Sequence, residues 1–147
     1  HMVEQEAHAI VNHNLSWDDL ERLAPTLRAC CYETTRITAH SIGAIREVCR
    51  ETTLSDSQGR NYTVYPGETI AASHYLYNVD PQNFSNQSDY RPNVQDGKQQ
   101  QQQTTADSRT FSAGVHKCPG EQIALILMQY FVALLLERRA AVHDSKL

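Results

Sequence analysis

One short stretch near the C-terminal end of the chain, FSAGVHKCPGEQ over residues 111–122, gathers residue types that can do chemistry. Cys118 stands directly before Pro119, a residue preferred at the first position of a helix, so we expect its sulfur to lie at a helix N-terminus. Free N–H groups and the positive end of the helix dipole favour an anion there. His116 and Lys117 add positive charge beside the sulfur. The pattern predicts a cysteine that is readily held as a thiolate.

Two glycines and one aromatic residue shape the same loop. Gly114 permits backbone conformations that are closed to other residues, and Gly120 leaves the helix start without a side chain. A flat group would therefore have room to lie against Gly120. Phe111 is placed to pack beneath the loop. On the cysteine and the helix start alone, an ordinary core cysteine at a Pro-Gly turn is the simpler interpretation.

The whole string is more specific, because it fits F-x-x-G-x-[RH]-x-C-x-G and so resembles the haem-binding loop of the cytochrome P450 superfamily. From average residue frequencies, its four fixed positions would coincide by chance in on the order of one chain in a few thousand. The resemblance implies haem b ligated by the Cys118 thiolate, which is then both metal ligand and catalytic group. It also implies that Phe111 shields the sulfur, that Gly114 and Gly120 make room for the porphyrin, and that His116 faces a haem propionate. A solvated surface imidazole is the alternative for His116.

A second landmark of that family lies upstream. Residues 27–37, LRACCYETTRI, follow Pro25 and carry a helical stripe of apolar positions. Within them Glu33 and Arg36 match the E-x-x-R of the family's K helix. Such a pair is commonly an exposed one worth a few tenths of a kcal/mol. Here the pair lies beside an apolar stripe and upstream of the strand patterns, which favours the family interpretation. The resemblance then implies a structural lock, in which the pair supports the haem loop from behind.

The resemblance also implies a third member of this lock, an arginine in a later F-x-P-x-R segment. The matching residues are 90–94, where the arginine position holds Val94. A buried Glu–Arg pair without its third member keeps unmet hydrogen-bonding capacity. Either Arg91 or Arg109 then substitutes, or the lock is weakened.

Between these landmarks the pattern changes from helical to extended. Residues 45–54 are β-branched and roughly alternating, and residues 61–65 predict a second strand that pairs with the first as a hairpin. After the turn at 66–67, residues 68–74 predict a third strand, which makes a small antiparallel sheet. The resemblance implies that Arg46, on the first strand, reaches a haem propionate. An exposed strand arginine is equally acceptable.

The remaining segments predict how the chain is organised. Residues 1–15 start with a His-Met pair typical of a cloning remnant and are expected to continue as the frayed end of a helix, whereas the resemblance implies that residues 16–147 form a partial cytochrome P450 domain. Ser16 opens a capping box with a carboxylate three residues later. Residues 95–110 contain five consecutive glutamines and predict a disordered loop. Residues 123–136 are apolar on every side and predict a helix that needs more neighbours than this chain offers.

Composition limits the function classes. The 147 residues carry 13 Lys+Arg against 17 Asp+Glu, a net charge of −4 without a basic cluster, so a nucleic-acid partner is not expected. No stretch is long and apolar enough for a membrane span, and no secretory signal is visible. The four cysteines lack C-x-x-C spacing, so we expect reduced thiols in an intracellular chain. A zinc site with irregular spacing is the remaining option, drawn from Cys30, Cys31, Cys49, His40 and His116.

Together these patterns predict a mainly α fold with a small antiparallel β-sheet, the C-terminal part of a cytochrome P450. By resemblance, the whole enzyme inserts an oxygen atom from O2 into a small organic substrate, lipid-like or of fungal secondary metabolism. Its partners are an NADPH-dependent reductase, docking near Lys117, and the N-terminal part of the fold. The whole protein is expected at the endoplasmic-reticulum membrane, with the anchor not encoded here and this chain soluble.

The N-terminal part carries the family's oxygen-activating helix, and no A-G-x-x-T-like stretch occurs in this sequence. The chain by itself is therefore not expected to be competent. Two alternatives stay open at this point. One is a haem-thiolate isomerase or dehydratase, which needs no reductase. The other is a truncated, non-catalytic chain that serves as a scaffold or partner subunit.

Overall fold

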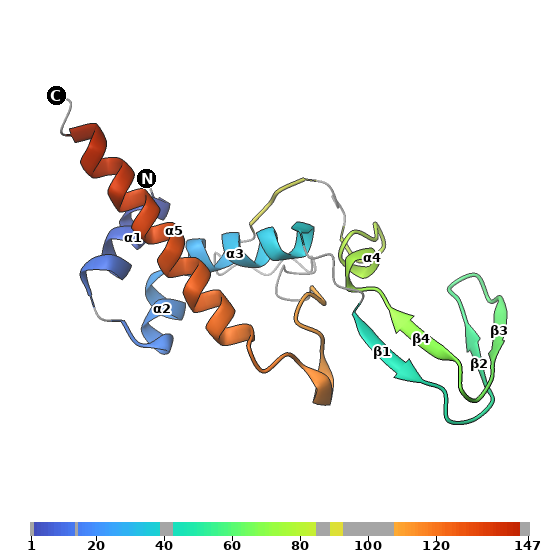
Figure 1. Cartoon of the computed structure of the whole chain (residues 1–147). Helices are drawn as coiled ribbons and strands as arrows, with labels where there is room; N and C mark the ends of the chain where they lie inside the picture. Colours follow the sequence, from blue (N-terminus) through green and yellow to red (C-terminus); the bar gives the residue numbers. More distant parts are fainter. Residues whose placement is uncertain (1, 14, 39–42, 85–88, 93–107, 145–147) are drawn as a thin grey trace.

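The computed structural model describes residues 2–13, 15–38, 43–84, 89–92 and 108–144, and Figure 1 shows their arrangement. Within these ranges helices dominate, and the strands form two small antiparallel sheets, which confirms the predicted fold class. The helices are α1 (Met2–Asn12), α2 (Trp17–Leu23), α3 (Pro25–Thr38), α4 (His74–Asn78) and α5 (Glu121–Asp144), with a 3-10 turn over Gly114–His116. The strands are β1 (Ala44–Glu47), β2 (Thr52–Ser55), β3 (Asn61–Val64) and β4 (Thr69–Ala72).

The N-terminal segment differs from its prediction. Instead of a frayed end, residues 2–12 form the complete helix α1, and its Ala7 and Ile10 are fully buried. Figure 1 shows α1 lying alongside α5, although the two helices are at opposite ends of the chain. The prediction failed because the apolar positions of α1 are few, and only packing against a distant helix makes them a core. The buried core cluster consists of Ala7, Ile10, Leu20, Ala24, Leu27 and Ala133.

Two different caps begin the helices that lead to the site. At α2 the predicted capping box is present: the Asp19 N–H donates to Ser16 Oγ at 3.3 Å and the Ser16 N–H donates to Asp19 Oδ2 at 3.2 Å. The pKa of Asp19 is lowered chiefly by the Ser16 hydroxyl, which donates to Asp19 Oδ2 at 2.7 Å, and further by the Arg22 guanidinium and the Ser16 N–H. At α3 the cap comes from another helix, because the Glu6 carboxylate of α1 accepts the N–H groups of Thr26 at 3.0 Å and Leu27 at 2.7 Å. An anion there satisfies free donors and complements the helix dipole.

The extended region, residues 44–72, consists of two antiparallel strand pairs. The β2–β3 hairpin is as predicted, but residues 45–54 do not form one strand. Their first part is β1, which pairs with β4, and their last part is β2, which pairs with β3. The change of partner follows Val48, whose N–H donates to Glu68 O at 2.9 Å and whose carbonyl accepts the Gly67 N–H at 3.0 Å. Gly67 has φ +88°, a conformation that alternation of apolar residues does not reveal.

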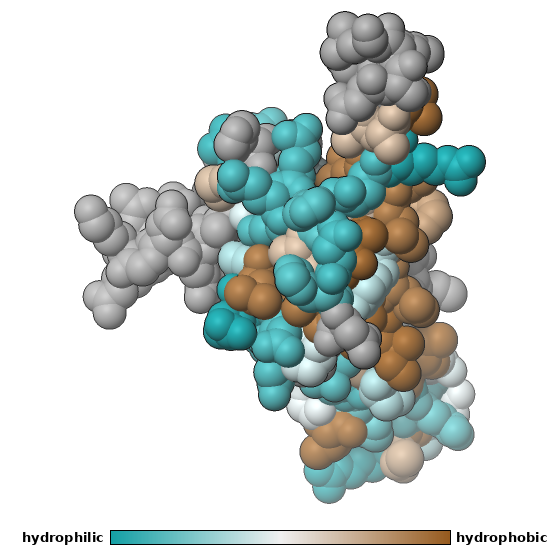
Figure 2. All heavy atoms as spheres, turned by 90° about the vertical axis from the view of Figure 1, so that its left-hand side faces the viewer, coloured by the Kyte–Doolittle hydropathy of each residue, from teal (hydrophilic) through white to brown (hydrophobic). Residues whose placement is uncertain are grey.

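One side of α5 is covered and the other is not. Leu125, Gln129 and Ala133 are fully buried. Exposed apolar side chains, each more than half accessible, follow the opposite side: Ile123, Leu127, Phe131, Leu134 and Leu135. Figure 2 shows apolar side chains gathered in a band along one side of the face it presents. The described part of the chain thus leaves α5 short of neighbours, as predicted, and it contains no helix long and apolar enough to cross a membrane.

Candidate functional site

The loop before α5 is closed by its own backbone. The Cys118 N–H donates to Phe111 O at 2.8 Å, and the Lys117 N–H donates to Gly114 O at 3.1 Å across the 3-10 turn. Gly114 has φ +65° and Ser112 has φ +64°. A Cβ on Gly114 would meet open space, so the backbone conformation alone explains the glycine. This hydrogen bonding holds the cysteine at a defined place relative to Phe111.

Cys118 is exposed, and its thiol is free, as are the thiols of the other three cysteines. Helix α5 begins at Glu121, two residues after the predicted start at Pro119, and the Glu121 N–H reaches Cys118 O at 3.4 Å. Helix ends vary by this much between definitions, so the sulfur still lies at the start of α5. A Cβ on Gly120 would stand 3.8 Å from Cys118 Sγ. The absence of a side chain at Gly120 therefore leaves free space directly beside the sulfur.

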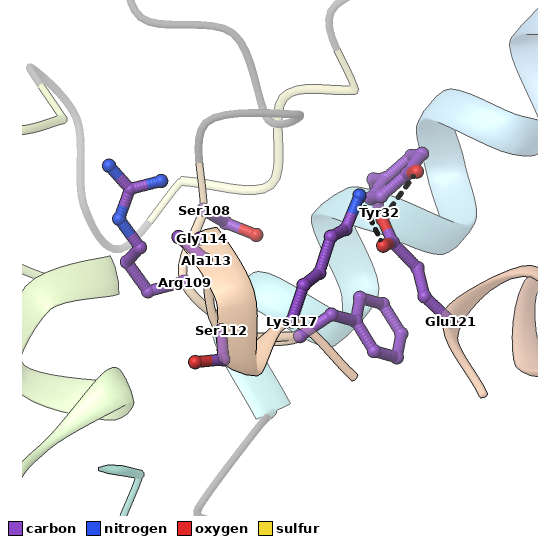
Figure 3. Close-up of a pocket in the computed structure, with 9 residues that line it drawn as sticks. Tyr32, Ser108, Arg109, Ser112, Ala113, Gly114, Lys117 and Glu121 are labelled. Carbon is purple, nitrogen blue, oxygen red and sulfur yellow. Dashed lines mark hydrogen bonds and ion pairs between the residues drawn. The ribbon is translucent and has the colours of Figure 1, made fainter. Parts of the chain in front are cut away.

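A polar cluster joins the start of α5 to α3. Glu121 is almost fully buried and accepts the Tyr32 hydroxyl at 3.0 Å and the Lys117 ammonium at 2.6 Å. Figure 3 shows Tyr32 and Lys117 converging on Glu121, while Arg109 extends away from them. Burial raises the pKa of Tyr32 to about 12, although the Arg28 guanidinium opposes the shift. Lys117, which was predicted to place positive charge beside the sulfur, is thus ion-paired with Glu121.

This cluster borders a hollow of about 180 Å³ on the α3 side of the loop. The hollow is too small for a tetrapyrrole, which is of drug-ligand size and takes a cavity of several hundred Å³. Sequence patterns did not single out Tyr32 or Glu121, because their contact spans 89 positions. The lining residues are Tyr32, Ser108, Arg109, Phe111, Ser112, Ala113, Gly114, Lys117 and Glu121.

The predicted Glu33–Arg36 pair is present and buried. Arg36 Nε donates to Glu33 Oε2 at 2.8 Å and Arg36 Nη2 donates to Glu33 Oε1 at 2.8 Å, a bidentate geometry. The two side chains are only 2–3 % exposed. The Phe84 ring lies 5.1 Å from the Arg36 guanidinium carbon. The pair is therefore a core element, in contrast to an exposed helical pair.

The arginines considered as a third member of the lock, Arg91 and Arg109, do not join the pair through their side chains. Val94 lies outside the described residues. Arg91 meets Glu33 through its backbone, with its N–H donating to Glu33 Oε1 at 3.0 Å, and its guanidinium pairs with Asp89 at 2.9 Å. The Arg109 guanidinium lies over the Tyr77 ring, 5.1 Å from its centroid. A backbone amide thus occupies part of the hydrogen-bonding capacity that an arginine was expected to meet.

Asn78, the last residue of α4, is a buried residue that the sequence patterns did not identify. Its side chain is fully buried, accepts the Arg109 N–H at 2.7 Å and donates to Thr110 Oγ1 at 3.0 Å. Its carbonyl accepts Arg36 Nη1 at 2.7 Å. The last three residues of the predicted disordered range 95–110 are consequently bonded into the fold, whereas residues 95–107 lie outside the described part.

Other predicted site residues lie on the surface. His116 is exposed. Arg46 of β1 is exposed as well, and its Nη1 donates to Ile45 O at 2.7 Å. Within the described residues no group of three His, Cys, Asp or Glu side chains is placed to hold a metal ion. His40, part of the zinc alternative, falls outside these residues.

Sequence comparison finds relatives over nearly the whole chain. The family pattern described as Cytochrome P450 matches residues 1–140. "Cytochrome P450 306a1" of Drosophila melanogaster is 31% identical over 124 residues, which are 81% of this chain and 20% of that protein. "Cytochrome P450 4F5" of Rattus norvegicus is 26% identical over 132 residues, 90% of this chain and 24% of that protein. The chain spans about a fifth to a quarter of the length of these relatives.

Solved structures share the fold. The crystal structure of CYP109E1 from Bacillus megaterium in complex with corticosterone aligns with a TM-score of 0.61 at 18% identity. That alignment covers 93% of this chain and 33% of the solved one. CYP105N1 from Streptomyces coelicolor A3(2) aligns with a TM-score of 0.57 at 22% identity, covering 92% of this chain and 31% of the solved one. At these identities the likeness concerns the fold alone.

Proposed function

Because this chain belongs to the cytochrome P450 family, we propose that it is the C-terminal, haem-binding part of a monooxygenase that inserts one oxygen atom from O2 into an organic substrate. One observation carries the proposal: the exposed Cys118 thiol sits at the start of α5, in a loop closed by the Cys118–Phe111 hydrogen bond. Family membership supports a haem with cysteine ligation. The part of the relatives' length that this chain lacks would supply the remainder of the site.

The residues present fit such a cofactor on the sulfur side of the loop. The thiol is a soft donor of the kind that ligates haem iron in the cytochromes P450. Gly120 leaves the space beside Cys118 Sγ open, where any other residue would place a Cβ 3.8 Å from the sulfur. Val115 and Ile123, from the same stretch of chain, are exposed apolar side chains that a porphyrin would cover. The small polar hollow on the α3 side is not the cofactor site.

Each residue of the loop then has a distinct task. Cys118 would hold the iron, and the Phe111 carbonyl fixes the cysteine backbone through its hydrogen bond. His116, which is exposed and lies two residues before the cysteine, would pair with a haem propionate, and we propose Arg46 for a propionate as well. When bound, haem supplies oxygen activation, which a thiolate ligand favours by pushing electron density toward the iron.

The partners follow from the same proposal. An NADPH-dependent reductase would supply electrons, and its docking surface is proposed near Lys117, which is 57% exposed beside its partner Glu121. The apolar side of α5 would be covered by the N-terminal part of the family fold. Substrate contacts would lie in that part, so the substrate is proposed only as a small, lipid-like or biosynthetic organic molecule.

Haem reconstitution tests the ligand assignment directly. The purified chain is mixed with haem, reduced and exposed to carbon monoxide, and the expected result is a thiolate-type Soret band. The band should disappear in Cys118→Ser. Cys49→Ser is the matched control, because Cys49 is also an exposed free cysteine, and its spectrum should be unchanged. A thiolate-type band that persists in Cys118→Ser, or none in the native chain, contradicts the proposal.

The exposed side of α5 also favours a second candidate, a non-catalytic chain that acts as a partner subunit. Five apolar side chains more than half exposed on one helix make a surface that single soluble chains seldom leave uncovered. Light scattering of the haem-free chain separates the two cases. A folded, monodisperse monomer would contradict the partner subunit, whereas a defined oligomer without haem affinity would support it.

A further inference from the structure

The first observation links Asn78 to the buried ion pair of α3. Arg36 Nη1 donates to the Asn78 carbonyl at 2.7 Å, and Asn78 Nδ2 lies 3.5 Å from the Arg36 carbonyl. Arg36 is itself held by both carboxylate oxygens of Glu33. Since Arg36 and Asn78 are both buried, these contacts attach the end of α4 to α3 with little freedom.

The second observation links the same residue to the loop that carries the cysteine. Asn78 Oδ1 accepts the Arg109 N–H at 2.7 Å, and Asn78 Nδ2 donates to Thr110 Oγ1 at 3.0 Å. The next residue is Phe111, whose carbonyl accepts the Cys118 N–H at 2.8 Å. Hydrogen bonds, together with the covalent link from Thr110 to Phe111, therefore connect the Glu33–Arg36 pair through Asn78 to the backbone of Cys118.

We infer that Asn78 is a positioning residue, which holds the Cys118 loop in register with the buried Glu33–Arg36 pair. The inference rests on the proposed function, because it gives the position of Cys118 a purpose. An asparagine suits the task, since its amide offers a donor and an acceptor on a short side chain. Leucine, which has the same number and branching of side-chain heavy atoms, offers neither, and aspartate lacks the donor.

The size of the effect follows from burial. Replacing Asn78 by leucine leaves the part-buried Arg109 N–H without its acceptor, next to a side chain that is itself fully buried. An unsatisfied buried group weakens a structure enough to increase local opening by about tenfold or more. The stacking of Arg109 on the Tyr77 ring remains, so the chain before the loop stays near α4. The opening should thus be local.

Hydrogen exchange on the full haem-free chain tests the inference. In Asn78→Leu, exchange of the amides from Arg109 to Cys118 should become about tenfold faster or more, with α5 amides such as Leu125 unchanged. Thr110→Val keeps the Asn78 bond to the Arg109 N–H but removes the bonds that the Thr110 hydroxyl accepts from Asn78 and from Ser108, and it should accelerate the same amides about threefold. The double variant should exchange no faster than Asn78→Leu alone. Asn83→Leu is the matched control, because half-buried Asn83 donates only a 3.3 Å bond to Tyr77 O, and its loop should exchange as in the native chain.

The outcomes are separable. Unchanged exchange at Arg109 and Cys118 in Asn78→Leu, or acceleration that is equal throughout the chain, overturns the positioning role. If Asn78→Leu does not fold, Thr110→Val decides, and unchanged loop exchange there overturns it. Haem reconstitution is read independently: a native chain that shows no thiolate-type band refutes the proposed function but leaves the exchange result standing. A thiolate-type band in the native chain, combined with unaltered loop exchange in Asn78→Leu, refutes only the role of Asn78.

Discussion

Replacing Glu33 by glutamine is the most informative single change in the core. Glutamine keeps the volume and shape of the side chain but removes the negative charge. Arg36 then keeps a permanent positive charge in a place where its side chain is 3% exposed. It loses one of two 2.8 Å charge-assisted hydrogen bonds, because the amide nitrogen cannot accept.

The magnitude follows from this geometry. Removing one partner of a buried ion pair costs about 3–5 kcal/mol, since the other charge is left uncompensated. A typical domain is stable by about 5–15 kcal/mol, so Glu33→Gln should remove between about a fifth and all of the stability. The Asn78 carbonyl and the Arg91 N–H, which also contact the pair, offer no charge that replaces the carboxylate.

Urea unfolding followed by far-ultraviolet circular dichroism measures the effect. We expect a lower midpoint with an unchanged dependence on urea, the signature of lost stability. Arg60→Gln is the control: it breaks a salt bridge to Asp56 at 2.6 Å on the hairpin, where the arginine is 64% exposed, and its midpoint should stay near the native value. The double variant Glu33→Met with Arg36→Met should be less destabilised than Glu33→Gln, because no buried charge remains.

Two results would refute this reasoning. A Glu33→Gln midpoint as close to native as that of Arg60→Gln would mean that the pair is not buried in solution. A double variant clearly less stable than Glu33→Gln would mean that the pair stabilises the fold by its own attraction, and that an uncompensated charge is not the main cost.

Three further predictions concern the helix starts and the loop. Ser16→Ala should lower stability by about 1 kcal/mol in urea unfolding, and no loss would mean that the capping box does not hold α2. Tyr32, with its pKa raised to about 12 against an ordinary 10.0, contributes stability that is present below pH 10 and lost as pH rises toward 12. Tyr32→Phe should abolish that alkaline loss and one late tyrosinate absorbance change; an unaltered titration would contradict the burial. Gly114→Ala should cost about 1 kcal/mol through its positive φ, whereas Gly120→Ala should be nearly neutral without haem yet hinder haem beside Cys118; equal stability losses would contradict the distinction.

The features that the sequence predicted well are local. The capping box of α2 and the start of α3 at its proline each depend on residues within about one helical turn of each other. The family of the chain could likewise be predicted from two short sequence patterns, the cysteine loop and the E-x-x-R of α3. Local chemistry is enough in these cases because neighbouring residues along the chain are already close together.

Predictions failed where the partner of a segment is distant. The split of residues 45–54 into β1 and β2 depends on which strand lies opposite each part, and a period-2 pattern is the same for either partner. The burial of α1 depends on α5 at the other end of the chain, and helical pattern alone cannot tell a frayed segment from a packed one.

By itself the sequence determined the cysteine, its place before a helix, the Glu–Arg pair and a net charge of −4. Only the tertiary structure decided what surrounds them: Asn78 between α3 and the loop, 42 positions from Arg36, and Glu121 against Tyr32. It also showed that a backbone amide at Arg91 reaches Glu33. The physical reason is that a buried polar group needs hydrogen-bond partners, and for Asn78 and Glu121 these partners come from separate elements, so their convergence is a property of the packed chain.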